Sequence, residues 1–192
     1  MKLDLKYLKK KYIKNFKNDE ALCDFIMTDV IFGFSEIYQV IKKKNDIKSV
    51  LEIGSGTGIL LNELKNFFPD INFIGIDPNE SGFHKYKEVY ESLNSNGPKI
   101  QNVQIENYNS DEKFDLIFSI NVFEHVKDWM KYIEQTSNLL KKDGSNIILA
   151  PNYDFPYEPH FVIPIIINKK ITKFFFKNKI NKNEIKTNEK GL

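Results

Sequence analysis

The sequence predicts an α/β protein whose doubly wound, mostly parallel sheet is covered by helices on both faces. From residue 47 onward, short apolar segments of strand length alternate with amphipathic segments of helical spacing. The apolar segments are hydrophobic almost throughout, which is typical of parallel strands buried on both sides. A glycine-rich turn also joins the first of these strands to the following helix.

Composition and charge divide the 192 residues into three segments. Residues 1–46 carry three apolar stripes at helical spacing and predict an N-terminal helical extension, with a kink or break at Gly33 and a turn at Asn45-Asp46. Residues 47–168 form the predicted core. Residues 169–192 are rich in lysine and asparagine, and we interpret them as a frayed tail or as part of a truncated domain.

Within the core, each predicted element follows from its pattern. Strands are expected at residues 49–53, 71–76, 101–105, 114–120 and 146–150. Helices are expected at residues 59–68, along the stripe from Phe83 to Leu93, and at 129–140, where Lys142-Asp143-Gly144 marks the stop. A five-stranded sheet would leave an edge unpaired unless residues 161–167 or a partner chain cover it.

Charge is distributed unevenly along the chain. The net charge is +2, but residues 18–168 carry −10 and the two lysine-rich ends carry +6 each. All 28 basic residues are lysines, so the chain lacks the guanidinium fork that binds phosphate and guanine bidentately. We therefore do not expect a nucleic-acid partner. An RNA-binding surface formed by the two ends stays open as an alternative, although a charge run is usually a solvated face.

Membrane and secreted classes are disfavoured. The longest apolar run, residues 161–167, includes a proline and is far shorter than the roughly 20 residues of a spanning helix. Residues 1–6 lead into lysines rather than into the apolar stretch of a secretory signal. Cys23 is the single cysteine, which excludes an internal disulfide and a cysteine-based zinc site. We expect no integral membrane segment and a cytoplasmic setting.

The strongest chemical signal is a strand that runs into a glycine loop. Glu52 precedes Gly54, Gly56 and Gly58, and a helix follows. Such loops let a ligand approach bare backbone at a helix N-terminus. Asp77 ends the next strand, at the position where a carboxylate binds ribose hydroxyls in doubly wound folds. Alone it could equally cap a helix, but the glycine loop favours the ribose interpretation.

Four stretches in order resemble the motifs of class I S-adenosylmethionine-dependent methyltransferases, which have a Rossmann-like fold. Residues 50–58 resemble motif I, and Ile76-Asp77 resembles motif II. Residues 114–126, FDLIFSINVFEHV, resemble the motif IV region of the EHV subgroup. Residues 139–144 resemble the LLKPGG turn, with lysine and aspartate replacing proline and glycine. The resemblance covers about residues 50–151.

This resemblance implies S-adenosylmethionine as cofactor and assigns roles by position. The loop and Glu52 would hold the methionine moiety and the ribose, Asp77 the ribose hydroxyls, and Pro78 and Glu106 the adenine. Two further positions would lie beside the reacting centre. The ten implied cofactor contacts are Glu52, Gly54, Ser55, Gly56, Gly58, Asp77, Pro78, Glu106, Ser119 and Asn121.

Glu124, His125 and His160 are the candidate catalytic residues. Glu124 and His125 follow the fourth strand, where a base could remove a proton from the methyl acceptor. The alternative is that Glu124 meets the dipole at the start of a helix and that His125 bonds a loop. His160 belongs to the aromatic, proline-rich segment 151–161, which could line an acceptor pocket or be a packed surface loop.

A tightly bound metal is not expected. Relatives such as ubiquinone-pathway O-methyltransferases carry Glu-x-x-Glu-His in this region and bind a divalent cation. Here Asn121 occupies the first of these positions, and losing a carboxylate weakens a site for a hard cation.

The resemblance implies methyl transfer to a small-molecule or glycan/lipid-precursor acceptor, with oxygen as the attacking atom. Two alternatives remain: an RNA methyltransferase, and a non-catalytic partner protein that binds the cofactor. The family usually adds a sixth and a seventh strand after the fifth, and we place no such hairpin after residue 150. We therefore expect that C-terminal strands are missing.

Overall fold

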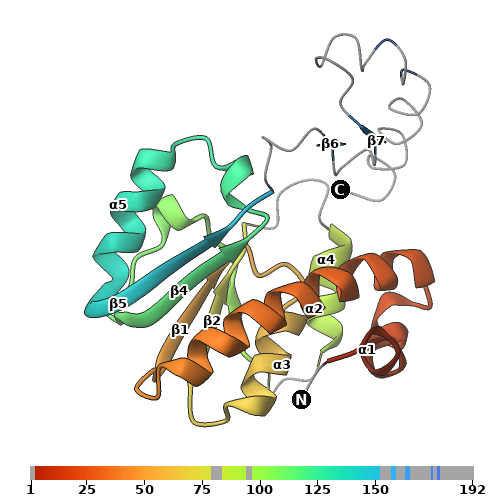
Figure 1. Ribbon diagram of the computed structural model, residues 1–192, viewed down its shortest axis with the longest axis horizontal. Coiled ribbons are helices and arrows are strands. Elements are labelled where there is room, and N and C mark those ends of the chain that lie inside the picture. The colour runs from red at the N-terminus through yellow and green to blue at the C-terminus, as the bar shows by residue number, and fades with distance from the viewer. Residues whose placement is uncertain are drawn as a thin grey trace.

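The computed structural model describes residues 3–78, 84–93 and 97–151, together with 157–158, 163–164, 174 and 177. Five strands form one sheet in the order β3-β2-β1-β4-β5 (Figure 1), and every pairing in it is parallel. The strands are β1 (Ser49–Ile53), β2 (Asn72–Ile76), β3 (Lys99–Gln101), β4 (Phe114–Ile120) and β5 (Leu140–Leu149). The predicted α/β class with a parallel sheet is confirmed.

Helices cover both faces of this sheet (Figure 1). The α-helices are α1 (Leu5–Tyr12), α2 (Glu20–Lys43), α3 (Ile59–Phe67), α4 (His84–Ser92) and α5 (Trp129–Leu139). Three short 3₁₀ helices are η1 (Ile13–Phe16), η2 (Ile105–Asn107) and η3 (Phe123–His125). Because strand side chains alternate between faces, Val50 packs with α2 and α3, whereas neighbouring Leu51 packs with Tyr132 of α5.

The N-terminal helices share the hydrophobic core of the sheet. Leu8, Phe34 and Ile37 belong to the same buried cluster as Val50 and Phe118. A polar network also joins the first helices to α3. Lys11 Nζ lies 2.7 Å from Glu63 Oε1, the Tyr12 hydroxyl donates to the same oxygen, and Asn62 Nδ2 donates to the Tyr12 hydroxyl over 2.8 Å. The buried Glu63 carboxylate is thus paired with both a cation and a hydroxyl.

The expected break at Gly33 is wrong, because α2 runs through this residue without interruption. A Cβ atom at position 33 would lie 2.5 Å from Ile120 Cδ1 and 2.8 Å from Leu60 Cδ2. The missing side chain therefore lets the helix lie close to the sheet and to α3. The predicted turn at Asn45-Asp46 is confirmed.

Two predicted strands are misplaced. The third lies at Lys99–Gln101 rather than at 101–105, and Ile105 instead begins η2 and is buried on the α5 side. The fifth begins at Leu140 rather than at 146, so the predicted helix stop at 142–144 lies within β5. The β4–β5 register jumps from Phe114↔Leu140 to Leu116↔Ser145, which makes the intervening residues a bulge.

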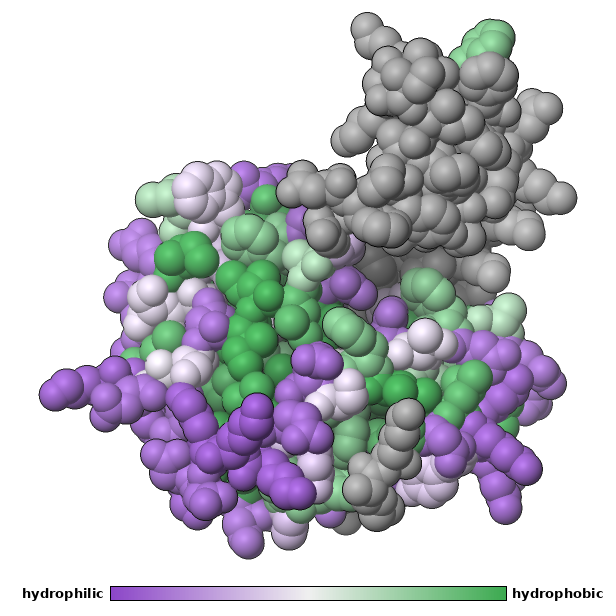
Figure 2. Space-filling model, in the orientation of Figure 1, coloured by the Kyte–Doolittle hydropathy of each residue, from purple (hydrophilic) through white to green (hydrophobic). Residues whose placement is uncertain are grey.

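The β5 side of the sheet is covered less completely than its centre. All five residues of β1 are buried, whereas every residue of β5 is half-buried or exposed. Among the described residues β5 pairs on one side only, with β4. Figure 2 shows apolar side chains gathered toward the middle of the face that is turned to the viewer, with hydrophilic ones along much of its rim.

The C-terminal region departs from the predicted loop in one respect. The short strands β6 (Tyr157–Glu158) and β7 (Ile163–Pro164) pair antiparallel in a separate two-stranded sheet, so a hairpin is present where none was expected. His160 and most of the predicted tail lie outside the described residues. Across the part of the chain that is described, none of the helices combines the length and apolarity that crossing a membrane requires.

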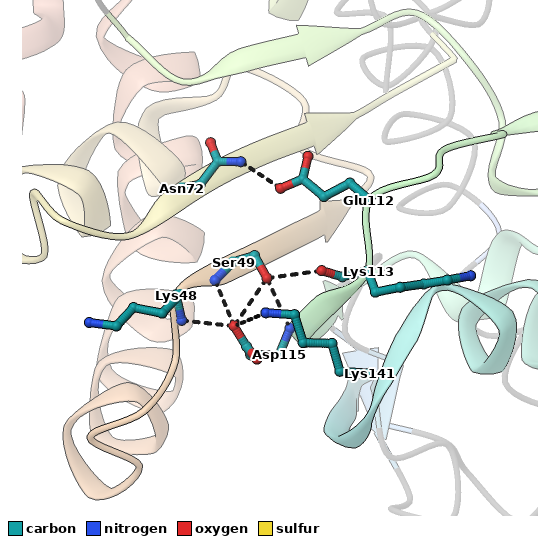
Figure 3. A network of polar contacts seen from close by, with 7 residues as sticks. All are labelled: Lys48, Ser49, Asn72, Glu112, Lys113, Asp115 and Lys141. Carbon is teal, nitrogen blue, oxygen red and sulfur yellow. Dashed lines mark hydrogen bonds and ion pairs between the residues drawn. The ribbon is translucent and has the colours of Figure 1, made fainter.

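Asp115 ties the amino ends of β1 and β4 together (Figure 3). Its Oδ2 atom accepts hydrogen bonds from the backbone N–H groups of Lys48 (2.8 Å) and Ser49 (2.9 Å), from Ser49 Oγ (3.0 Å) and from Lys141 Nζ (2.9 Å). Partial burial acts to raise the pKa of this carboxyl, but Lys141 and the backbone donors outweigh it, so the pKa is lowered. Asp115 therefore has a structural role at the amino ends of the strands, opposite the end that carries the glycine loop.

We expect Asp115→Ala to lower the free energy of unfolding by about 2–4 kcal/mol, because it leaves several partly buried donors without an acceptor. Since the folded pKa lies below the unfolded one, this contribution is present above the ordinary value of 3.8 and is lost as the pH falls through the folded pKa. Urea denaturation at pH 7 and pH 3 measures both effects. Asp143→Ala, at an exposed position in the β5 bulge, serves as the control. Equal stability losses for the two variants at pH 7 would contradict the role of Asp115.

Candidate functional site

The glycine loop between β1 and α3 is held against the ends of two neighbouring strands. Gly54, Gly56 and Gly58 all have positive φ angles, of 74°, 50° and 70°, which glycine adopts without strain. The N–H groups of Gly54 and Ser55 donate to the carbonyl of Ile76 over 2.8 and 3.1 Å. A Cβ atom on Gly54 would lie 2.2 Å from the side chain of Val122, which follows β4. The carboxyl ends of β1, β2 and β4 therefore meet at this loop.

Asp77 lies directly against the loop. Its Oδ2 atom accepts a hydrogen bond from the backbone N–H of Gly56 over 2.8 Å. The carboxylate thus stands at the end of β2 and faces the backbone where a bound nucleoside would approach. Pro78 follows it and is half-buried. The Asp77 carboxylate thus contacts the glycine loop, and the Asp77 backbone N–H donates to the carbonyl of Gln101 in β3 over 3.0 Å.

Glu52 is a buried carboxyl with an unused acceptor. Glu52 lies in β1, the central strand of the sheet, and is 4% exposed. Its Oε2 atom accepts no hydrogen bond from any described residue. Burial, and then the charge of Asp77, raise its pKa well above the ordinary value. Ser55 Oγ is likewise buried without a described partner. Unsatisfied polar atoms beside bare glycine backbone fit a ligand that brings its own hydrogen-bonding groups and positive charge.

The structure gives three other predicted cofactor residues, Ser119, Glu106 and Asn121, different surroundings. Ser119 is fully buried, and its Oγ accepts a hydrogen bond from the Tyr132 hydroxyl of α5 over 2.9 Å. The structure therefore directs this hydroxyl to the α5 face rather than to the loop. Glu106 lies in η2, half-buried and on the same face. Burial raises the pKa of Tyr132, the Ser119 hydrogen bond lowers it, and the charge of Glu106 raises it. Asn121 is exposed, has a φ of 53°, and donates its backbone N–H to the carbonyl of Leu149 over 2.9 Å.

Glu124 and His125 form η3 and have different surroundings. Both carboxylate oxygens of Glu124 are buried and accept no hydrogen bond from any described residue, whereas His125 is exposed. Helix α5 begins only at Trp129, and its N-cap is Asp128, which accepts from the N–H of Lys131 over 3.0 Å. Glu124 therefore lies in the first turn of η3 and not in that of α5, and its meeting the dipole of a helix stays an open alternative.

Among the described residues there is no group of three or more His, Cys, Asp or Glu side chains that could hold a metal ion. The expectation that no metal is tightly bound stays a prediction, and so do the roles of Glu124, His125 and His160.

Two residues near the glycine loop, Tyr86 and Asp29, were not predicted from the sequence. A Cβ atom on Gly56 would lie 3.2 Å from the ring of Tyr86 in α4, so this ring lies over the loop. Burial raises the pKa of Tyr86, and the charges of Asp29 and Asp77 raise it further. Asp29 reaches this region from α2. The hydrophobic spacing marked Tyr86 as a core residue, and no local signal connects α2 with the glycine loop.

Comparison with known proteins gives one family match. The model of a family described as "Methyltransferase domain" matches residues 23–174. An uncharacterized protein of Mycobacterium tuberculosis is 33% identical over 147 residues, which are 75% of this chain and 50% of that protein. The match to (S)-coclaurine N-methyltransferase of Papaver somniferum is 26% identical and covers 57% of this chain and 31% of that one. A malonyl-(acyl-carrier protein) O-methyltransferase of Ilyobacter polytropus is 28% identical over 71% of this chain and 52% of its own.

Among solved structures, the plantazolicin methyltransferase crystallised with a pentazolic desmethylPZN analog and S-adenosylhomocysteine has a TM-score of 0.54 at 24% identity. The match covers 76% of this chain and 54% of that one, and shows a common fold. The chain spans about half the length of the first relatives that it matches.

Proposed function

The chain belongs to the methyltransferase domain family, with the Rossmann-like fold of class I, and from this premise we propose that it transfers a methyl group from S-adenosylmethionine to a small-molecule acceptor. The observation that carries the proposal is the joined loop and carboxylate: Asp77 bonds the Gly56 N–H beside the buried, unpartnered Glu52.

The residues present suit this cofactor. Its amino group and sulfonium are cationic, and the described site offers the carboxyl groups of Glu52 and Asp77 beside backbone that carries no side chains. Glu52 would hold the amino group, Asp77 the ribose hydroxyls, and Pro78 the adenine. When bound, the cofactor supplies a methyl group that is already activated, so the chain has to align the acceptor and accept its proton. Glu124 and His125 stand at the edge where the acceptor would lie.

The acceptor class is a second part of the proposal. A small molecule fits better than RNA because three lysines of the basic N-terminal segment, Lys9, Lys11 and Lys17, form ion pairs with acids of the same chain. The resemblance favours oxygen as the attacking atom and a glycan or lipid precursor as the acceptor. The printed names of the relatives include both an O- and an N-methyltransferase, so the choice between oxygen and nitrogen depends on the charge of the site itself.

Titration calorimetry with S-adenosylhomocysteine tests the cofactor proposal. We expect saturable binding by the wild type and binding at least about 100-fold weaker by Asp77→Ala, because two charge-assisted hydrogen bonds of about 1.5–3 kcal/mol each are lost. Asp70→Ala, at an exposed carboxylate in the turn before β2, should bind like the wild type. A folded wild type that binds no cofactor, or an Asp77→Ala variant that binds normally, would contradict the proposal.

A further inference from the structure

Glu124 resembles Glu52 in having a buried carboxylate oxygen without a described partner, and in Glu124 this holds for both oxygens. Both oxygens are shielded from solvent, and neither accepts a hydrogen bond from a described residue. The residue lies two positions after Val122, whose side chain contacts Gly54 of the cofactor loop. It therefore lies in the segment after β4 that borders the cofactor loop.

Shortage of cations does not explain the missing partner, since the chain contains 28 lysines. Two other carboxylates that lie wholly or partly inside the protein do have partners. Glu63 pairs with Lys11 and Tyr12, and Asp115 accepts from Lys141 and two backbone N–H groups. A carboxyl group that is buried without a hydrogen-bonding partner is costly, and a native structure that keeps one usually has a ligand or function to account for it.

An aromatic pair adjoins Glu124 in the chain, and two acidic groups lie at the cofactor loop. Phe123, the preceding residue, packs its ring against Tyr132, with 5.3 Å between the ring centroids. The charge of Glu106 acts on Tyr132 and raises its pKa. Glu52 and Asp77 add acidic groups on the side of the cofactor, whose own positive charges compensate them. The two unpartnered oxygens of Glu124 themselves favour a cationic donor over a carboxylate or a phosphate.

We propose that the acceptor is an amine, which binds as an ammonium ion through hydrogen bonds to the Glu124 carboxylate. This inference rests on the proposed methyl transfer and names its substrate class. An ammonium ion supplies both the charge and the several N–H donors that two unpartnered carboxylate oxygens accept. Glu124 is then a catalytic residue, because it touches the reacting nitrogen.

The proton balance of the step follows from this contact. The bound ammonium transfers one proton to Glu124, which frees the nitrogen lone pair. The lone pair attacks the sulfonium methyl carbon, a C–N bond forms, the C–S bond breaks, and its electron pair stays on sulfur as a thioether. The methylated nitrogen leaves with the positive charge that the sulfonium lost. Glu124 then returns its proton to solvent.

Matched probes test the acceptor class on protein saturated with S-adenosylhomocysteine. Three hydrocarbon groups (butyl, phenylethyl and decyl) are each tested as the amine, the alcohol and the carboxylate, and every compound is titrated by calorimetry. Trp129, the single tryptophan, lies five residues after Glu124 and is 57% exposed, so its fluorescence gives a second readout. For at least one hydrocarbon group, the amine should bind at least 10-fold more tightly than the corresponding alcohol and carboxylate. Glu124→Gln should remove this preference, whereas Glu134→Gln, at an exposed position of α5, should keep it.

Each result has one meaning. Equal responses of the three probe classes, including no response to any of them, overturn the inference, as does a preference that survives Glu124→Gln. Saturable Mg²⁺ binding by the wild type and not by Glu124→Gln, without an amine preference, would assign the carboxylate to a metal and would also overturn it. Binding of S-adenosylhomocysteine is measured first, so a failure of the cofactor proposal is seen separately from a failure of the amine proposal.

Discussion

Gly54→Ala is expected to abolish S-adenosylhomocysteine binding and to lower the free energy of unfolding by about 2–4 kcal/mol. Two independent effects combine at this residue. Its φ angle of 74° lies in the left-handed region, where an L-residue costs about 1–2 kcal/mol. The new Cβ atom would also lie 2.2 Å from Val122 Cγ2, a distance that only a shift of the loop or of the segment after β4 relieves.

A double-mutant cycle separates the two effects. Val122→Ala removes the colliding methyl groups, so it should restore part of the stability of Gly54→Ala and leave the backbone strain. Calorimetry and urea denaturation of the four proteins measure binding and stability together. Gly97→Ala, at the bend before β3, provides a glycine substitution away from the loop. If Val122→Ala restores nothing, the clash is not the cause, and if Gly54→Ala binds normally, the loop does not hold the cofactor.

The sheet was predictable from the sequence because its central strands carry an unambiguous signal. Residues 49–53 and 114–120 are mostly apolar, and both strands occur with the predicted bounds. The wrong predictions concern residues that are typical of more than one kind of local structure. Gly33 has the signature of a helix breaker, but the close approach of Ile120 and Leu60 explains it. Lys142-Asp143-Gly144 has the signature of a helix stop, but it is a bulge that only the pairing with β4 reveals.

The candidate site was predictable only where chemistry and local sequence coincide. Gly56 and Asp77 are 21 residues apart, and the motif spacing alone placed them together, as the 2.8 Å contact shows. Ser119 has a motif position too, but side chains alternate along β4, and its hydroxyl meets Tyr132 on the opposite face. The ring of Tyr86 over Gly56 and the nearby charge of Asp29 depend on tertiary packing between segments far apart in the chain, which periodicity does not encode.

Glu52 should couple cofactor binding to the release of a proton. In the cofactor-free protein, burial and then the neighbouring Asp77 raise the pKa of this carboxyl, so the fold favours the neutral form. Its contribution to stability is therefore fully present below the unfolded pKa and is lost as the pH rises through the folded pKa. A cationic amino group beside the carboxyl reverses this preference, since an opposite charge favours the ionised form.

Calorimetry of S-adenosylhomocysteine in two buffers of different ionisation enthalpy counts the proton. The wild type should release up to about one proton per cofactor bound, and Glu52→Gln close to none. Glu52→Gln should also lose less stability than the wild type between pH 5 and pH 8, because the glutamine stays neutral throughout. His125→Gln, which removes the titratable side chain after β4, should leave the proton release unchanged. Equal binding heats in both buffers would show that Glu52 is already ionised before the cofactor arrives, and the buried carboxyl would then need a counter-charge from the chain itself.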